Sequence, residues 1–152
     1  VWANTDPDEN TFSTNSTWLG TSGNYCFMAL AKTPGLIGVG TYTGNTSADG
    51  PVIVADDGAS GFKPAAVLVK RNADGYAWHL HNSTLSPHNP VSDGVNLNDN
   101  GGKGSAELGD FLANGWKIRT TNGGYNAAAT WVYVAFGADP FGGDGVAQGK
   151  AR

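Results

Sequence analysis

The chain has 152 residues, a length that favours one domain and is sufficient to bury a core. Charged residues make up only 14% and the net charge is −4, which argues against a nucleic-acid-binding surface. No apolar run has the length of a membrane span, so we expect no membrane insertion. Cys26 is the only cysteine, which excludes an intrachain disulfide and a cysteine-rich zinc site.

Composition predicts a protein built from strands. Glycine accounts for 23 residues, and Thr, Asn and aromatic residues are frequent while strong helix formers are scarce. This is typical of short strands joined by tight turns. We therefore expect an all-β fold, an antiparallel β-sandwich or jelly roll with an extended N-terminal arm. The predicted division is an arm over 1–24, a β-sandwich domain over 25–141 and a Gly-rich tail over 142–152.

Apolar runs and turn residues predict the elements in chain order. The arm is polar, and its few large apolar residues need a surface on which to dock. Residues 82–103 are predicted to form a long irregular loop, because they contain two prolines and five asparagines. The expected strands cover 25–31, 37–43, 51–55, 64–71, 76–81, 111–113, 116–120 and 130–137.

The stretch 64–71 is predicted to be the central strand. It holds five consecutive apolar residues, too few for a helix and typical of a strand buried on both faces. The turn residues at 72–75 indicate a hairpin with 76–81, and Asn114-Gly115 indicates a second hairpin. The predicted core consists of Val67, Leu68, Val69, Trp78, Leu80, Phe111, Trp116, Ile118, Val132, Val134 and Phe136.

One internal repeat is visible. Tyr25–Pro34 and Trp131–Pro140 share a pattern of alternating aromatic and apolar residues that ends in proline, at an offset of 106 positions (131 − 25). One interpretation is that two buried strands converged on similar composition. The other is that residue 34 ends one repeat unit and that 35–140 form the next.

Candidate chemistry is sparse. Alternation puts His79 and His81 on one strand face, and with His88 nearby they are candidates for a metal site, although hydrogen-bonded strand histidines are the simpler interpretation. The asparagines and Glu107 in 96–107 have the spacing of a calcium loop but too little charge. Residues 58–61 fall one residue short of a nucleophile elbow. We therefore expect no catalytic residue, no metal and no cofactor.

Short motifs occur in a fixed order through most of the chain. They are Gly-Thr-Tyr-Thr-Gly-Asn at 40–45, Gly-Phe-Lys-Pro-Ala at 61–65, Val-Lys-Arg at 69–71, Asp-Phe-Leu at 110–112, Asn-Gly-Trp-Lys-Ile-Arg at 114–119 and Tyr-Val-Ala-Phe at 133–136. As an ordered set over roughly residues 25–152, they resemble a domain family of the tail fibre and adhesin proteins of tailed phages. The resemblance implies a non-enzymatic module, often found beside lectin-like β-sandwich domains.

The expected function follows from this resemblance. It is a structural and adhesive module on a virion surface, hence extracellular, in a tail fibre or a related fibre or decoration component. The expected partners are copies of the chain itself, in a homo-oligomer or filament, and a host cell-surface glycan. The alternative is a carbohydrate-binding, lectin-like receptor-binding domain, and a more distant one is a polysaccharide depolymerase. Partners that are nucleic acids are not expected.

Two groups of residues are candidates for these contacts. Strand addition to a neighbour's sheet edge would use the arm and the first predicted strand, so residues 1–24 are expected to lie on an adjacent copy. The assembly candidates are Trp2, Phe12, Trp18, Leu19, Tyr25 and Phe27. The candidates for a glycan or receptor loop, in and after the central hairpin, are Tyr76, His79, His81, His88 and Asn89.

Overall fold

The computed structural model describes residues 27–72 and 75–138. In this part of the chain, eight strands form one antiparallel sheet in the order β1-β8-β3-β4-β5-β6-β7-β2. The short helix α2 (Gly123–Asn126) lies between β7 and β8. The strands are β1 Ile37–Thr43, β2 Val52–Val54, β3 Pro64–Arg71, β4 His79–Asn82, β5 Val91–Asn96, β6 Gly104–Leu112, β7 Gly115–Ile118 and β8 Thr130–Gly137.

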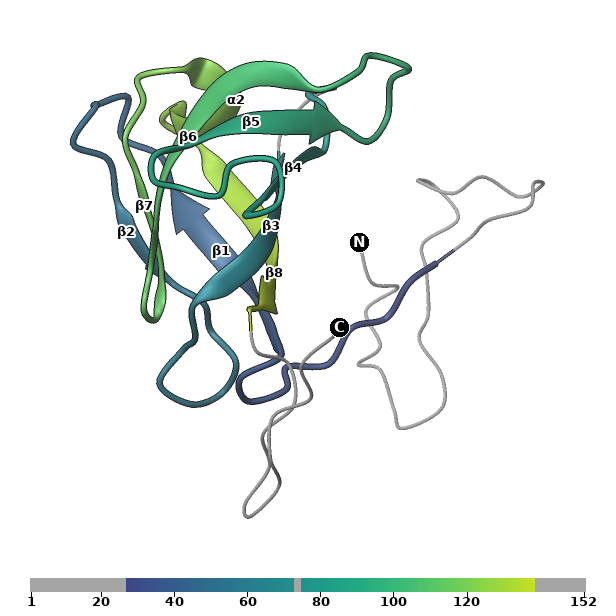
Figure 1. Cartoon of the computed structure of the whole chain (residues 1–152), viewed down its shortest axis with the longest axis vertical. Coiled ribbons are helices and arrows are strands. Elements are labelled where there is room, and N and C mark those ends of the chain that lie inside the picture. Colours follow the sequence, from purple (N-terminus) through teal and green to yellow (C-terminus); the bar gives the residue numbers. More distant parts are fainter. Residues whose placement is uncertain (1–26, 73–74, 139–152) are drawn as a thin grey trace.

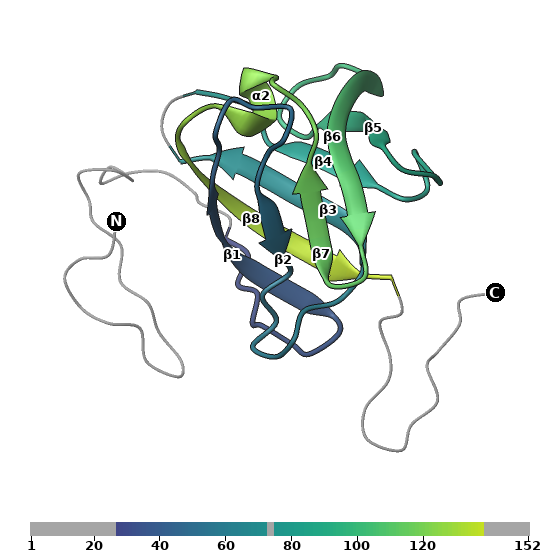
Figure 2. The same ribbon diagram turned by 90° about the vertical axis from the view of Figure 1, so that its left-hand side faces the viewer.

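The sheet curls until its two edge strands, β1 and β2, approach each other (Figures 1 and 2). The prediction of an all-β antiparallel fold is confirmed. The two facing layers expected of a sandwich are opposite walls of one continuous, nearly closed sheet, because each strand pairs with the next around the barrel.

Several predicted elements match the structure closely. The expected strands 37–43, 64–71 and 130–137 coincide with β1, β3 and β8. The central hairpin is present, with Val69 opposite His79 in the pairing of β3 with β4. The Asn-Gly hairpin is also present, since Leu112 of β6 pairs with Gly115 of β7.

Two predicted elements are wrong. The expected loop over 82–103 contains β5, which pairs with β4 on one side and β6 on the other. Its own sequence has only two apolar residues, so these neighbours rather than local pattern stabilise it. The expected strand over 25–31 is not found in its described part, because residues 27–32 have no regular structure.

Burial alternates along the strands instead of covering both faces, contrary to the expectation for 64–71. In β3, Val67 and Val69 are fully buried while Leu68 on the opposite face is only half-buried. In β8, the buried side chains are Trp131, Tyr133 and Ala135, and the half-buried ones are Val132, Val134 and Phe136. The barrel core thus takes one face of each strand.

Five predicted core residues are buried: Val67, Val69, Phe111, Trp116 and Ile118. Trp78 is a wrong prediction, because it lies just before β4 and its side chain is 38% exposed. The other five, Leu68, Leu80, Val132, Val134 and Phe136, are half-buried on the outer face. Aromatic residues that the prediction omitted fill the core instead; the rings of Tyr42 and Trp131 stack with centroids 5.9 Å apart.

The central position of β3 gives a stability prediction. We expect Val69→Ala to lower the free energy of unfolding by about 1–3 kcal/mol, because it removes buried methyl groups and leaves a cavity. Val52→Ala is the matched control, since Val52 is 58% exposed on an edge strand and should change little. Urea denaturation measures both variants. If Val69→Ala and Val52→Ala lowered the free energy of unfolding equally, the assignment of Val69 to the core would be contradicted.

Candidate functional site

The most distinctive polar site is a pocket at one end of the barrel, next to α2. Its volume is about 200 Å³, which is room for several water molecules or one small polar ligand. The pairing of β4 with β5 places His79 opposite Asn96. Helix α2 adds Tyr125, and Asn122 caps the helix by accepting a hydrogen bond from the Gly124 N–H. Glycines form most of the remaining wall: Gly94, Gly102, Gly104 and Gly124.

The protonation state of His79 follows from its neighbours. Its Nδ1 lies 2.7 Å from Oδ1 of Asn96, whose amide is oriented by donating from Nδ2 to Asp99 at 2.8 Å. Because an amide oxygen only accepts, Nδ1 carries the proton and Nε2 is a bare acceptor. Burial lowers the pKa of His79, so the neutral ring is favoured. Nε2 is buried and has no hydrogen-bond partner among the described residues.

His81, on the same face of β4, is fully buried. Its ring packs against Gly94, where a Cβ atom would come within 2.7 Å of the ring, and its centroid lies 5.0 Å from that of Tyr125. Burial lowers the pKa of His81 to about 4, with a smaller contribution from His79; the Asp93 backbone opposes the shift. Neither ring nitrogen has a partner of good hydrogen-bond geometry in the described part of the chain.

The other predicted glycan residues lie elsewhere. His88 and Asn89 line a separate hollow of about 240 Å³ beside Phe111. The amide of Asn89 is engaged with the backbone of Phe111 through two hydrogen bonds of 2.9 Å, so it holds the loop to β6. The ring of Tyr76 stacks under the guanidinium of Arg71, 4.0 Å from its centroid. The structure therefore brings together only His79 and His81.

The sequence analysis did not identify three of the pocket residues as possible ligand contacts. They are Asn96, Asn122 and Tyr125. Asn96 was considered only as part of a calcium-like spacing. The signal that could have identified Asn122 is its position before Gly-Gly, where an Asn commonly caps a helix. Nothing in the sequence places Tyr125 against the two histidines, since the contact joins distant segments.

A second feature is the seam between the edge strands β1 and β2. One end is closed: the Val39 N–H donates to the Asp56 carbonyl at 2.9 Å, and the Tyr133 hydroxyl donates to the Val54 carbonyl at 2.9 Å. The same hydroxyl accepts from the Asp56 N–H at 3.1 Å. A groove of about 580 Å³ runs along this seam and is lined by residues of both strands, among them Thr41 and Val52.

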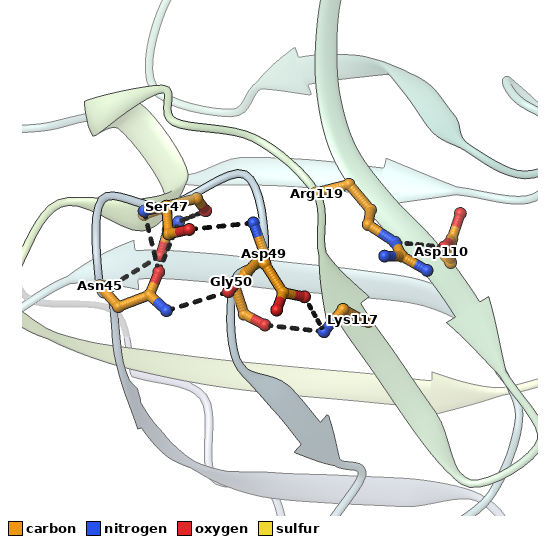
Figure 3. A network of polar contacts seen from close by, with 8 residues as sticks. Asn45, Ser47, Asp49, Gly50, Asp110, Lys117 and Arg119 are labelled. Carbon is orange, nitrogen blue, oxygen red and sulfur yellow. Dashed lines mark hydrogen bonds and ion pairs between the residues drawn. The ribbon is translucent and has the colours of Figure 1, made fainter.

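A polar network pins the loop that joins β1 to β2 (Figure 3). Lys117 of β7 pairs with the Asp49 carboxylate at 2.7 Å and donates to the Gly50 carbonyl at 3.2 Å. The buried amide of Asn126 accepts from the Asn45 N–H at 2.9 Å and donates to the Ser47 carbonyl at 2.7 Å. The hydrogen bond from Lys117 lowers the pKa of Asp49, so this contact persists well below neutral pH.

Most predicted assembly residues, Trp2, Phe12, Trp18, Leu19 and Tyr25, lie outside the described residues. Phe27 is described, and its side chain is 74% exposed. Across 27–72 and 75–138, no group of three or more His, Cys, Asp or Glu side chains could hold a metal ion. Nor does any helix described there have the length and apolar character of a membrane span.

Comparison with protein families gives one match. Residues 1–140 match the model of a domain of unknown function, DUF7483. The chain belongs to the DUF7483 family. No curated protein and no solved structure matched the chain. The family match covers the arm together with the barrel and assigns neither of them a role.

The buried histidines predict an acid-sensitive fold. Because the pKa of His81 is lowered from 6.5 to about 4, the unfolded chain binds more protons between these values, and stability falls as the pH falls through that window. We expect the free energy of unfolding to drop by about 2 kcal/mol from pH 7 to pH 5 because of His81 alone. His81→Leu should remove that part of the drop.

The matched control is His88→Gln, which changes an exposed imidazole in the loop before β5. It should leave the difference between pH 7 and pH 5 in place. Urea denaturation at both pH values would refute the role of His81 if His81→Leu retained the full difference.

Proposed function

We propose that this domain is a non-enzymatic structural and adhesive module of a virion surface, part of a tail fibre or a related fibre or decoration component, that assembles with copies of itself. The resemblance of the ordered motifs to tail fibre domains is what supports the virion setting. The observation that carries self-association is a stripe of apolar side chains on the outer face of the barrel.

We call this feature the outer stripe. One row runs straight across five neighbouring strands, in register from β1 to β5: Val39, Val134, Leu68, Leu80 and Val95. A second row beside it contains Ile37, Phe136 and Ala66. All eight side chains are half-buried, and they lie on the face of the sheet opposite the core.

This stripe is unusual for a sheet that faces water. Antiparallel sheets with one solvated face normally alternate apolar residues inside with polar residues outside. The same sheet follows that rule next to the stripe, where Asp93 of β5 pairs with Lys103 at 2.9 Å. Contiguous apolar surface of this kind commonly marks a protein–protein contact. The occupant we propose is a second copy of the chain.

The open part of the seam supports an edge contact as well. Val52 and Val54 of β2 are 58% and 44% exposed, on a strand of only three residues. An unpaired strand edge is a template for strand addition. Assembly of this module through its sheet edges would use this groove, lined by Thr41 of β1 and Val52 of β2.

Self-association is tested by light scattering coupled to size-exclusion chromatography. We expect the intact chain to form oligomers, and Leu68→Thr combined with Val134→Thr to weaken their association constant about tenfold or more, because both changes make the stripe polar. Ser105→Thr, on the exposed part of β6, is the control and should change nothing. A chain that stays monomeric over the accessible concentration range would contradict the proposal, and electron microscopy would show whether the oligomers are fibres.

A second candidate function is binding of a carbohydrate in the pocket beside α2. The observation that favours it is the bare Nε2 of His79, a buried neutral acceptor in the wall of a polar pocket. Sugar hydroxyls are donors that could satisfy this nitrogen. Among the predicted residues, His79 would make this contact, and the rings of His79 and His81 both pack against Tyr125.

A glycan array followed by calorimetry tests this candidate. We expect His79→Gln to weaken binding of any glycan found by about tenfold, the loss of one hydrogen bond to a buried acceptor. The control variant His88→Gln should bind the same glycan with the affinity of the unchanged protein. If no glycan binds, or if His88→Gln causes the larger loss, the pocket is not the receptor site.

A further inference from the structure

The outer stripe needs an occupant, and the chain carries a segment that suits it. We propose that residues 1–32 of a second copy lie across the stripe. This inference rests on the proposed self-association, and it names the part of the partner that makes the contact.

The point at which this segment leaves the barrel is fixed. Thr33 and Ile37 exchange two backbone hydrogen bonds of 2.9 Å, which closes a tight turn before β1. The Gly35 N–H donates to the buried carboxylate of Asp57 at 2.9 Å, and Lys32 pairs with Asp56 at 2.5 Å. The segment therefore starts from a rigid anchor at the end of β1, next to Ile37 of the stripe.

From this anchor the described residues 27–32 lead away from their own barrel. Residues 27–32 have no regular structure, and they run outward as the purple trace at the start of the described chain (Figure 1). The side chain of Met28 is 72% exposed. The described residues 27–32 thus include an exposed apolar side chain and run outward from the barrel, while the same chain carries a partly exposed apolar stripe.

The composition of the segment fits a place on a sheet. Residues 25–31 repeat the pattern of β8, with aromatic or apolar residues at nearly every position, so both faces of an extended strand would be apolar. Earlier in the segment, Trp2, Phe12, Trp18 and Leu19 offer further large side chains. Such side chains gain from burial, and the polar residues between them can face water.

The segment is also long enough. Residues 1–26 precede the described chain, and at about 3.3 Å per extended residue they reach up to about 85 Å. The five strands of the stripe, at about 4.8 Å spacing, span only about 20 Å. The segment is therefore long enough to cross the whole stripe of a neighbouring copy. Mutual exchange of segments would close a dimer, and exchange in one direction would build a fibre.

The single cysteine offers a direct test. Cys26 can be coupled to a maleimide carrying a benzophenone in the intact protein, which is then mixed as equal parts of ¹⁵N-labelled and unlabelled chains and irradiated. We expect mass spectrometry to find crosslinks between labelled and unlabelled chains that join Cys26 to peptides of β3 or β8. In Leu68→Thr with Val134→Thr, the yield should fall about tenfold or more, and in Ser105→Thr it should not.

The other possible outcomes contradict either this inference or the proposed function. Crosslinks confined to single chains would mean that the segment folds onto its own barrel and would overturn the inference. Crosslinks between copies that avoid β3 and β8 would also overturn it, while leaving self-association intact. A monomeric protein would instead remove the proposed function itself. Cys26→Ser combined with Ser22→Cys repeats the test with the probe moved along the segment, so that a local effect of the label is recognised.

Discussion

The barrel depends on one hydroxyl group at the seam between its edge strands. Tyr133 belongs to β8, yet its hydroxyl reaches past β1 to hold the backbone of Val54 and Asp56. This path exists because Gly40 has no side chain, since a Cβ there would lie 2.7 Å from the hydroxyl. Burial raises the pKa of Tyr133, so the hydroxyl keeps the proton that it donates. This side chain, together with the backbone hydrogen bond from Val39 to Asp56, closes the eight-stranded sheet where a ladder is missing.

Closing the sheet in this way shapes its outer surface. The core is filled by large aromatic rings from β1, β7 and β8, with Trp116 and Tyr133 in edge contact at 4.8 Å. Two of these strands, β1 and β8, also carry half of the outer stripe on their opposite faces. Because the inner face is already packed, the apolar stripe that crosses five strands is not needed to fill the core. Its apolar character therefore points to contacts outside the barrel.

The sequence predicted those parts of the fold whose signals are local. Apolar runs bounded by Gly and Pro identified β3, and Asn114-Gly115 identified the hairpin of β6 and β7. It could not identify β5, where Gly94 breaks the apolar pattern and pairing on both sides supplies the stability. It also took the apolar residues of β3 as buried on both faces. A strand with one face in the core and the other against a partner has the same pattern, so sequence alone cannot separate the two.

Of the candidate pocket, only the histidine pair on β4 was predictable from the sequence. Alternation along a strand places His79 and His81 on one face, but the residues around them come from β5 and α2 and required the tertiary structure. Packing alone does not explain a histidine at position 81, because Leu or Phe could contact Tyr125 without burying two ring nitrogens that lack a well-placed partner among the described residues. Proteins that break such a local rule commonly do so at functional sites. The end of the barrel next to α2 thus holds the buried histidines, and its wall carries the half-buried apolar stripe.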